Sequence, residues 1–508
     1  MGRCLAAPHA VPVAPHRTAL NDALANLTSV SLRSVALGVG DEGAAQLARA
    51  LRGAVPSLRS LDVSGNHLGK KAARTLADAL CWSAPTTENA RRAFGPDVPV
   101  AVCGVYGGAA AAACATGGCN LEHLDLSGNH IGSEGARALA DALVRNGCPR
   151  LKRLDVSRNL IGAAGVAAVA ELLVAQATRR GVGDTGTAHR GFRAHVLCEL
   201  SLRHNGCGDA GAAAVAAAMR KSAELSASRR TNEDARANRT RFDDVSNSSS
   251  TGSRGLIAHS LDVLKLGFNG IGPTGASALA EAIAAVRAAA ARAVLRNGAT
   301  PSSSTAAKSV VLGELDLACN AVGPEGARAL GGALDDGVAK LDLGNNAILC
   351  AGAKELARAL VTNGSTTDLC LAGNDIAADG AWWIAEFMAK TKRVSRLSGL
   401  DLGSNAVGDA GACDLAEEIG ECGSLRHLDL RRNDITNVGA TSFCEAFRKL
   451  DEAAARKNAG SSFFVTTAPS VCLRGNAVDS ACQNSIREKF GLRIDVELQV
   501  KQAARHAY

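Results

Sequence analysis

The chain repeats one short pattern, and this repetition constrains the fold more than any other feature of the sequence. In its clearest form, over Leu121–Leu143, the pattern reads LEHLDLSGNHIGSEGARALADAL. A fixed period with one supersecondary unit per repeat is typical of a solenoid, in which every repeat buries its apolar side against its neighbours. Close versions of the pattern occupy Leu58–Leu80, Leu151–Leu173, Leu312–Leu334, Leu397–Ile419 and Leu425–Phe447.

Each repeat is predicted to contain a strand, a turn and a helix. Leu124 and Leu126 are two residues apart, so they lie on the same side of an extended segment. Ile131 follows the turn and is placed to fill the core. The segment Gly135–Leu143 then has apolar residues at helical spacing, which predicts a helix that packs against the strand.

An asparagine follows the strand leucines in almost every repeat. Its carboxamide both donates and accepts hydrogen bonds, so it can satisfy backbone groups of the turn that would otherwise be buried without partners. We expect these side chains to form a ladder along the solenoid, and the loss of one to cost about 1–3 kcal/mol. The expected ladder consists of Asn66, Asn129, Asn159, Asn205, Asn269, Asn320, Asn346, Asn374, Asn405, Asn433 and Asn476.

The strand-and-turn segments LDLSGN, LDVSRN, LDLGNN, LDLGSN and LDLRRN resemble the core of the leucine-rich repeat. The similarity is to the form of about 28 residues found in ribonuclease inhibitor, the Ran GTPase-activating proteins and the repeat tails of NOD-like receptors. This resemblance implies an α/β solenoid shaped as a horseshoe, with a parallel sheet on the concave face and helices on the convex face.

The resemblance covers residues 27–490, or about 11 to 12 repeats, between a divergent N-terminal segment 1–26 and a C-terminal cap and tail 491–508. The first repeat has Val35 where asparagine is expected, which indicates a degenerate capping unit. Near the other end, RIDVELQV alternates polar and apolar residues and indicates a closing strand.

Larger spacings between asparagines place insertions after a helix and before the next strand. They are rich in Ala, Gly, Ser, Thr and Arg, and the composition of Ser222–Ser253 favours disorder. Their shared position puts them on one rim of the horseshoe, either as an adaptable binding edge or as tolerant loops in which low-complexity sequence has accumulated. The insertions lie near residues 81–120, 175–195, 221–260, 284–310 and 450–469.

The residue between the two strand leucines should point onto the concave face, and in most repeats it is aspartate. Neighbouring strands lie about 4.7–4.9 Å apart, so these carboxylates would create a negative potential that favours a cationic partner surface. Capping of local backbone donors explains the same aspartates. The candidate partner-binding acids are Asp62, Asp125, Asp155, Asp316, Asp342, Asp401 and Asp429.

Two further features are candidates for binding. A group of basic residues near the C-terminal end would give the concave face both negative and positive charge and so orient a protein ligand. A solvated surface explains the same basic residues equally. The basic group consists of Arg426, His427, Arg431, Arg432 and Arg474.

Trp382 lies on a helix and should face outward on the convex side, either as an interaction hot spot or flat against the next helix.

Composition excludes several classes of protein. A hydrophobic content of 47% and a mean hydropathy of +0.05 are compatible with a large core. The net charge of +7 over 508 residues is too weak and too mixed to favour nucleic acid, and no apolar run reaches the roughly 20 residues needed to span a bilayer. Without an apolar secretory leader, the 16 cysteines are expected to be reduced thiols in a cytoplasmic protein.

No catalytic constellation stands out from the repeats, and no cofactor or metal is expected. The sequence therefore predicts a non-enzymatic scaffold that binds another protein through the concave face and one rim. The resemblance also leaves open a GTPase-activating protein for a Ran-like small GTPase. That family typically has an acidic tail after the repeats, whereas Lys501–Tyr508 is short and basic, so no catalytic residue is transferred. Oligomeric state is not predicted.

Overall fold

The computed structural model describes most of the repeat region of the 508-residue chain. The predictions for residues 1–26, for the insertion 81–120 and for the tail beyond 496 lie outside the described residues, as do those for the later parts of the other insertions. The described residues are 28–35, 43–48, 58–80, 121–146, 150–179, 197–240, 261–296, 311–334, 337–361, 363–391, 396–420, 423–458 and 469–496.

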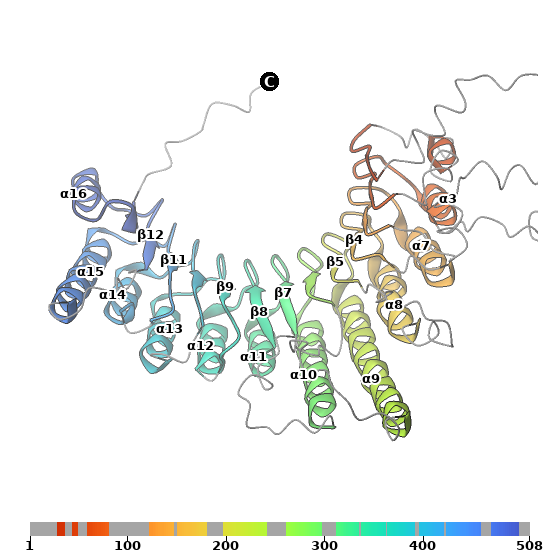
Figure 1. The fold of residues 1–508 in the computed structure, drawn as a ribbon. Coiled ribbons are helices and arrows are strands. Elements are labelled where there is room, and N and C mark those ends of the chain that lie inside the picture. The colour runs from red at the N-terminus through yellow and green to blue at the C-terminus, as the bar shows by residue number, and fades with distance from the viewer. Residues whose placement is uncertain are drawn as a thin grey trace, which may run out of the picture.

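The described strands form one parallel sheet whose 13 strands follow each other in chain order. The sheet lines the inner side of an open arc, and the helices lie along its outer side (Figure 1). The predicted solenoid, with a concave parallel sheet and convex helices, is confirmed. The strands are β1 (Ser29–Ser31), β2 (Ser60–Asp62), β3 (His123–Asp125), β4 (Arg153–Asp155), β5 (Glu199–Ser201), β6 (Val263–Lys265), β7 (Leu312–Asp316), β8 (Val338–Asp342), β9 (Asp368–Cys370), β10 (Gly399–Asp401), β11 (His427–Asp429), β12 (Ser470–Cys472) and β13 (Ile494–Asp495).

The helices follow the strands one by one. In the repeat Leu121–Leu143, the helix begins at Gly132, about one turn before the predicted start at Gly135. The described helices are α3 (Lys70–Leu80), α7 (Gly132–Asn146), α8 (Gly162–Arg179), α9 (Gly208–Thr240), α10 (Pro273–Arg296), α11 (Gly323–Ala333), α12 (Leu349–Leu360), α13 (Ala378–Thr391), α14 (Gly408–Glu418), α15 (Asn437–Asn458) and α16 (Ser480–Phe490), with a 3₁₀ turn η1 (Gly491–Arg493).

The strand leucines align from one repeat to the next and form the core. Leu124 pairs with Leu61 on one side and with Leu154 on the other, and all three are buried. Because side chains alternate along a strand, this alignment also places the flanking aspartates in register on the opposite face. The sheet register therefore sets both the apolar filling and the surface column.

The eleven asparagines lie in one row at the ends of the strands. In Asn205, Oδ1 accepts hydrogen bonds from the backbone N–H groups of Asn159 and Ile161, at 3.0 and 3.5 Å. Its Nδ2 donates to the carbonyls of Leu202, in its own repeat, and Val156, in the preceding one, both at 3.0 Å. Each of the eleven donates to a carbonyl of the preceding repeat in this way.

Glycine in the first turn of successive helices lets each helix approach the one before it. At Gly352 an added Cβ would lie 2.4 Å from Ile348 Cγ2 and 3.1 Å from Pro324 Cα, in the first turn of α11. Such contacts are too short for any side chain, so the spacing between helices depends on these positions. The same geometry recurs at Gly135, Gly165, Gly275, Gly326, Gly380, Gly411 and Gly439.

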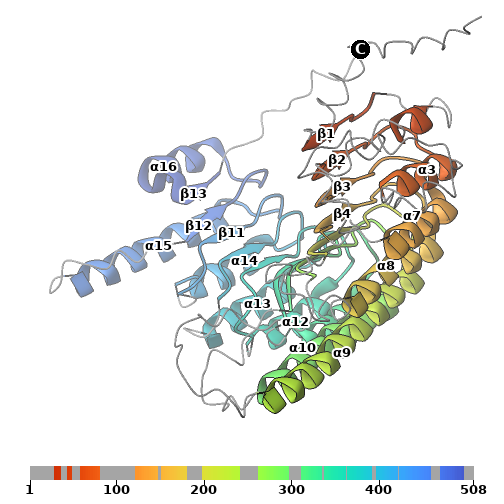
Figure 2. The same ribbon diagram turned by 45° about the vertical axis from the view of Figure 1, so that its right-hand side comes forward.

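The prediction of disorder from Ser222 to Ser253 is wrong for its first part, because helix α9 continues to Thr240. After Gly211 this helix contains no glycine or proline, and it is rich in alanine, so nothing ends it where the repeat pattern stops. Likewise α8 and α10 continue into the predicted insertions, and the three long helices lie side by side on the convex side (Figures 1 and 2). None of the described helices combines the length and apolarity needed to cross a bilayer.

The two ends of the described sheet differ. At the N-terminal end, the backbone N–H of Val35 donates to Asn66 Oδ1 at 3.0 Å, so this repeat uses the ladder of its neighbour without adding an asparagine. At the C-terminal end, β13 pairs in parallel with β12, and Ile494 and Val496 are buried. This strand lies within the predicted closing segment.

Candidate functional site

The concave aspartates lie in one column but in three separate groups. Register pairs Asp62 with Asp125 and Asp125 with Asp155 on strands β2 to β4. Ser201 and Lys265 then interrupt the column. The later groups, Asp316 with Asp342 and Asp401 with Asp429, are separated by Cys370.

Each of these aspartates has a local structural contact. One carboxylate oxygen accepts a hydrogen bond from the backbone N–H two residues later, at 2.8 to 3.0 Å, as Asp155 does from Ser157 at 2.8 Å. The carboxylate thereby holds the turn at the end of the strand, and only its second oxygen is available for other partners. The remaining contacts join Asp125 to Ser127, Asp316 to Ala318, Asp342 to Gly344, Asp401 to Gly403 and Asp429 to Arg431.

Arginines from the same or other repeats contact the second oxygen of several aspartates. Arg203 Nη1 lies 3.0 Å from Asp316 Oδ2, and the Asp316 side chain is buried. Arg431 Nη2 lies 3.1 Å from Asp401 Oδ2 and 2.9 Å from Asp429 Oδ2. In this half of the column, the negative charge is therefore partly neutralised within the chain.

In the N-terminal group, the ion pair among the described residues is that of Asp62, whose Oδ2 lies 3.7 Å from Arg33 Nε. Burial raises the pKa of Asp155, and the neighbouring Asp125 carboxylate raises it further, against hydrogen bonds from Ser157 that lower it. Burial also raises the pKa of Asp62, but hydrogen bonds from Ser64 and Ser31 outweigh it, and the pKa is lowered overall. Asp125 and Asp155, on adjacent strands, thus lie close enough to repel, and a cation placed over them would relieve that repulsion.

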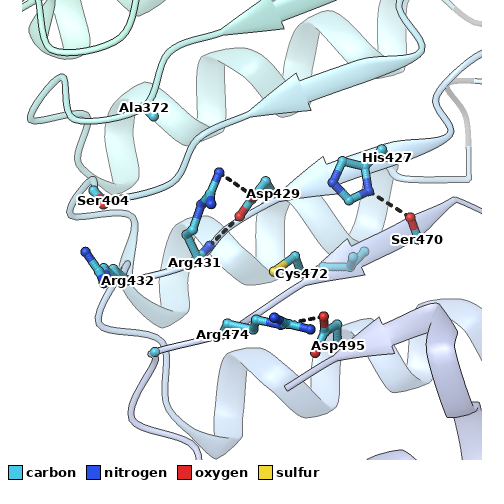
Figure 3. A pocket seen from close by; sticks show the side chains of 12 residues that line it. Ala372, Ser404, His427, Asp429, Arg431, Arg432, Ser470, Cys472, Arg474 and Asp495 are labelled. Atoms are coloured by element: carbon cyan, nitrogen blue, oxygen red, sulfur yellow. Dashed lines mark hydrogen bonds and ion pairs between the residues drawn. The ribbon is translucent and has the colours of Figure 1, made fainter. Parts of the chain in front are cut away.

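The predicted basic group is divided by the structure. His427, Arg431, Arg432 and Arg474 line a cavity of 460 Å³ at the C-terminal end of the concave face (Figure 3), whereas Arg426 is exposed and does not line it.

The cavity has mixed charge. Arg474 Nε lies 2.6 Å from Asp495 Oδ2, and Arg431 extends to Asp429, while His427 Nδ1 is 2.9 Å from Ser470 Oγ (Figure 3). Carboxylates therefore alternate with the guanidinium groups, and the cavity is not uniformly basic.

Trp382 lies on α13, on the convex side, and the structure does not bring it near the concave column. Its side chain is 45% exposed and meets Trp383 edge to face, with ring centroids 4.8 Å apart. Trp383 is half-buried, and Lys354 Nζ lies 4.3 Å from the centre of its ring. The exposed indole thus rests on a packed neighbour.

A further surface feature was missed by the sequence reasoning. The rings of His204 and Phe268 stack at 3.9 Å between centroids, with Arg203 Cζ 5.6 Å from the Phe268 ring. Both stacked residues have left-handed backbone, at φ 53° and 59°, in a turn position that is glycine in other repeats, such as Gly128. A bulky residue at a position that favours glycine is the signal that could have revealed them.

The described cysteines are free thiols, and several are inert for a physical reason. Burial raises the pKa of Cys207 to about 11 and, together with the Asp342 and Asp401 carboxylates, raises the pKa of Cys370 to about 12. Within the described ranges, no group of three His, Cys, Asp or Glu side chains is placed to hold a metal ion.

These pKa values predict selective alkylation. With iodoacetamide at pH 8, Cys207 and Cys370 should react at least about tenfold more slowly than the exposed Cys198, because the thiolate is the nucleophile. Peptide mass spectrometry over a time course measures the three rates. Equal labelling of Cys198 and Cys370 in the folded chain would contradict the prediction, and labelling in denaturant supplies the fully reactive control.

Comparison with known proteins agrees with this geometry. A family model described as leucine-rich repeat matches residues 56–77, 119–140, 147–170, 258–280, 309–331 and 421–444. The chain is 36% identical over 110 residues to the human NACHT, LRR and PYD domains-containing protein 2, a match that covers 22% of this chain and 10% of that protein.

Two solved structures are similar in outline. An internalin from Listeria monocytogenes shares 12% identity, with a TM-score of 0.41 over 94% of this chain and 88% of its own. A complex of TLR13 with ssRNA13 shares 14% identity, with a TM-score of 0.35 over 88% of this chain and 48% of the other. With repeats matched along the sequence and stacked as one parallel sheet with outer helices, this chain is a leucine-rich repeat protein.

Proposed function

We propose that this leucine-rich repeat chain is a non-enzymatic scaffold that binds another protein along its concave face. The observation that carries the proposal is the fixed row of charged, partly exposed side chains on adjacent strands, above all Asp62, Asp125 and Asp155. A rigid row of like charges on a curved sheet suits an extended, complementary protein surface. The partner surface facing this group is proposed to be basic.

The N-terminal aspartates allow a test that leaves the fold intact. In the triple variant Asp62→Asn, Asp125→Asn and Asp155→Asn, each side chain keeps an oxygen that can accept the backbone N–H bond but loses its charge. Partners identified by proximity labelling with the wild-type chain should be captured at least about tenfold less well by this variant, corresponding to about 1.4 kcal/mol.

A matched control changes the same number of charges in the same repeats on the convex side. Asp78→Asn, Asp141→Asn and Glu171→Gln alter exposed positions on α3, α7 and α8. This control should retain every partner. Equal capture by the concave and convex variants would show that the concave charges do not bind the partner.

The identity of the partner is a separate question. Acceleration of GTP hydrolysis by Ran in the presence of the chain would support the alternative of a GTPase-activating protein, and no acceleration would exclude Ran as its substrate. The proposed location is the cytoplasm, where free thiols such as those described stay reduced. A partner that is protein and not nucleic acid is likewise part of the proposal.

A further inference from the structure

A second hollow lies on the concave face between β7 and β11, with a volume of 300 Å³. It exists because β10 has Gly399 at the surface position where its neighbours β9 and β11 have Asp368 and His427. A Cβ added at Gly399 would lie 2.7 Å from Asp368 Oδ1. One missing side chain thus opens the sheet surface down to the layer beneath.

The floor of this hollow is uncharged. Leu341, Leu369 and Leu400 contribute to it from three successive strands, and because their side chains are buried in the core on the other side of the sheet, strand backbone forms the floor at these positions. Cys370 lies beside them, with Sγ 3.8 Å from Asp401 Oδ2. Because the pKa of this thiol is raised to about 12, it is neutral at physiological pH. The floor can therefore pack against methylene groups without placing a charge beneath them.

The walls carry an excess of negative charge. Four carboxylates line the hollow, those of Glu314, Asp342, Asp368 and Asp401, against the single ammonium group of Lys340. Lys340 Nζ lies 4.0 Å from Asp368 Oδ2, at the limit of an ion pair. Asp401 is paired with Arg431, and Glu314 Oε1 lies 3.9 Å from Lys265 Nζ, whereas among the described residues no cationic group lies within ion-pair distance of Asp342. The hollow is therefore complementary to a cation with an apolar stem.

We propose that this hollow is a specificity pocket for an arginine side chain of the partner, an inference that rests on the proposed function. Arginine combines methylene groups, which can lie on the uncharged floor, with a planar guanidinium that offers five N–H donors to carboxylates on several sides. Asp342 and Asp368 come from neighbouring strands β8 and β9, so one guanidinium can face both. A glutamate would be repelled, and an apolar side chain would give Asp342 no cationic partner.

A photo-crosslinking peptide tests the pocket in the full-length chain. The probe is Gly-Ala-Arg-Ala-Gly with a benzophenone residue next to the arginine, and matched probes carry lysine, citrulline or glutamate instead. Citrulline has nearly the shape of arginine but no charge. We expect the arginine probe to label peptides containing residues 340–342, 368–370 or 399–401, and the citrulline and glutamate probes to label them at least about tenfold less.

Two variants separate shape from charge. Gly399→Leu fills the hollow, and Asp368→Asn keeps its shape but removes one wall charge; both should reduce labelling by the arginine probe, the first at least about tenfold. Ser60→Leu is the matched control, because Ser60 lies in the equivalent column on β2, outside the pocket. Unchanged labelling of Gly399→Leu, or equal labelling by the citrulline probe, would overturn the pocket. Partner capture by the Asp62, Asp125 and Asp155 variant is measured separately. A negative result for the arginine pocket would therefore leave the proposed scaffold function untouched.

Discussion

Replacing Asn346 with alanine should lower the free energy of unfolding of the surrounding repeats by about 3 kcal/mol. The Asn346 side chain is fully buried. Its Oδ1 accepts the backbone N–H of Val322 at 3.2 Å, and its Nδ2 donates to the carbonyls of Leu317 and Leu343 at 2.9 and 3.0 Å. Alanine would leave the Val322 N–H buried without an acceptor and remove bonds that join two repeats.

Amide hydrogen exchange of the segment containing Val322, together with chemical denaturation, measures this effect. A repeat array need not unfold in one step, so the local measurement is the decisive one. Asn345 is the matched control, since it is exposed and has left-handed backbone at φ 55°. Asn345→Gly should change stability by less than about 1 kcal/mol. Equal losses at the two positions would show that the ladder does not stabilise the fold.

The repeat pattern predicted most of the fold because its periods are local. The spacing of Leu124, Leu126 and Asn129 sets the strand and the turn, and these elements occur where expected. The ends of the helices were less predictable. Alanine-rich sequence after a repeat helix, as in α9, is compatible with either a loop or a longer helix. In the structure the helix is longer, and it packs against α8 and α10.

The candidate site was less predictable because its contacts cross repeats. Arg431 was expected to belong to a basic surface, yet it pairs with Asp401, thirty positions earlier in the chain, and with Asp429 of its own repeat. Whether such a side chain faces solvent or an aspartate depends on register and on the curvature of the sheet. A column read from sequence gives the order of the charges along the face but not their partners.

The pocket at Gly399 shows the same dependence on neighbours. Glycine in a strand carries little information alone, and only its register with Asp368 and His427 turns it into a hollow. The stacked pair His204 and Phe268 arises similarly, since 64 positions separate residues that the solenoid places side by side. Surface features of this fold are therefore properties of adjacent repeats rather than of single ones.

The spacing between helices leads to the second large stability prediction, because it depends on the glycine column. Gly352→Val should destabilise the chain by about 3 kcal/mol, since overpacking of a close contact costs about 1–3 kcal/mol and the valine methyl groups extend beyond the Cβ. That Cβ alone would lie 2.4 Å from Ile348 Cγ2 and 3.1 Å from both Ala327 Cβ and Pro324 Cα. Helix α12 would have to move away from α11, which weakens the contact between two repeats.

The same substitution at Gly332 separates this steric effect from helix propensity. Gly332 lies in α11 and is exposed, and a Cβ added there would meet nothing within 4 Å. Valine has a higher helix propensity than glycine, so Gly332→Val should be neutral or stabilising by up to about 0.5 kcal/mol. Thermal and denaturant unfolding of the two variants should therefore change in opposite directions, or differ by at least about 2 kcal/mol. Similar changes in stability at both positions would show that the close approach of neighbouring helices is not what the glycine column provides.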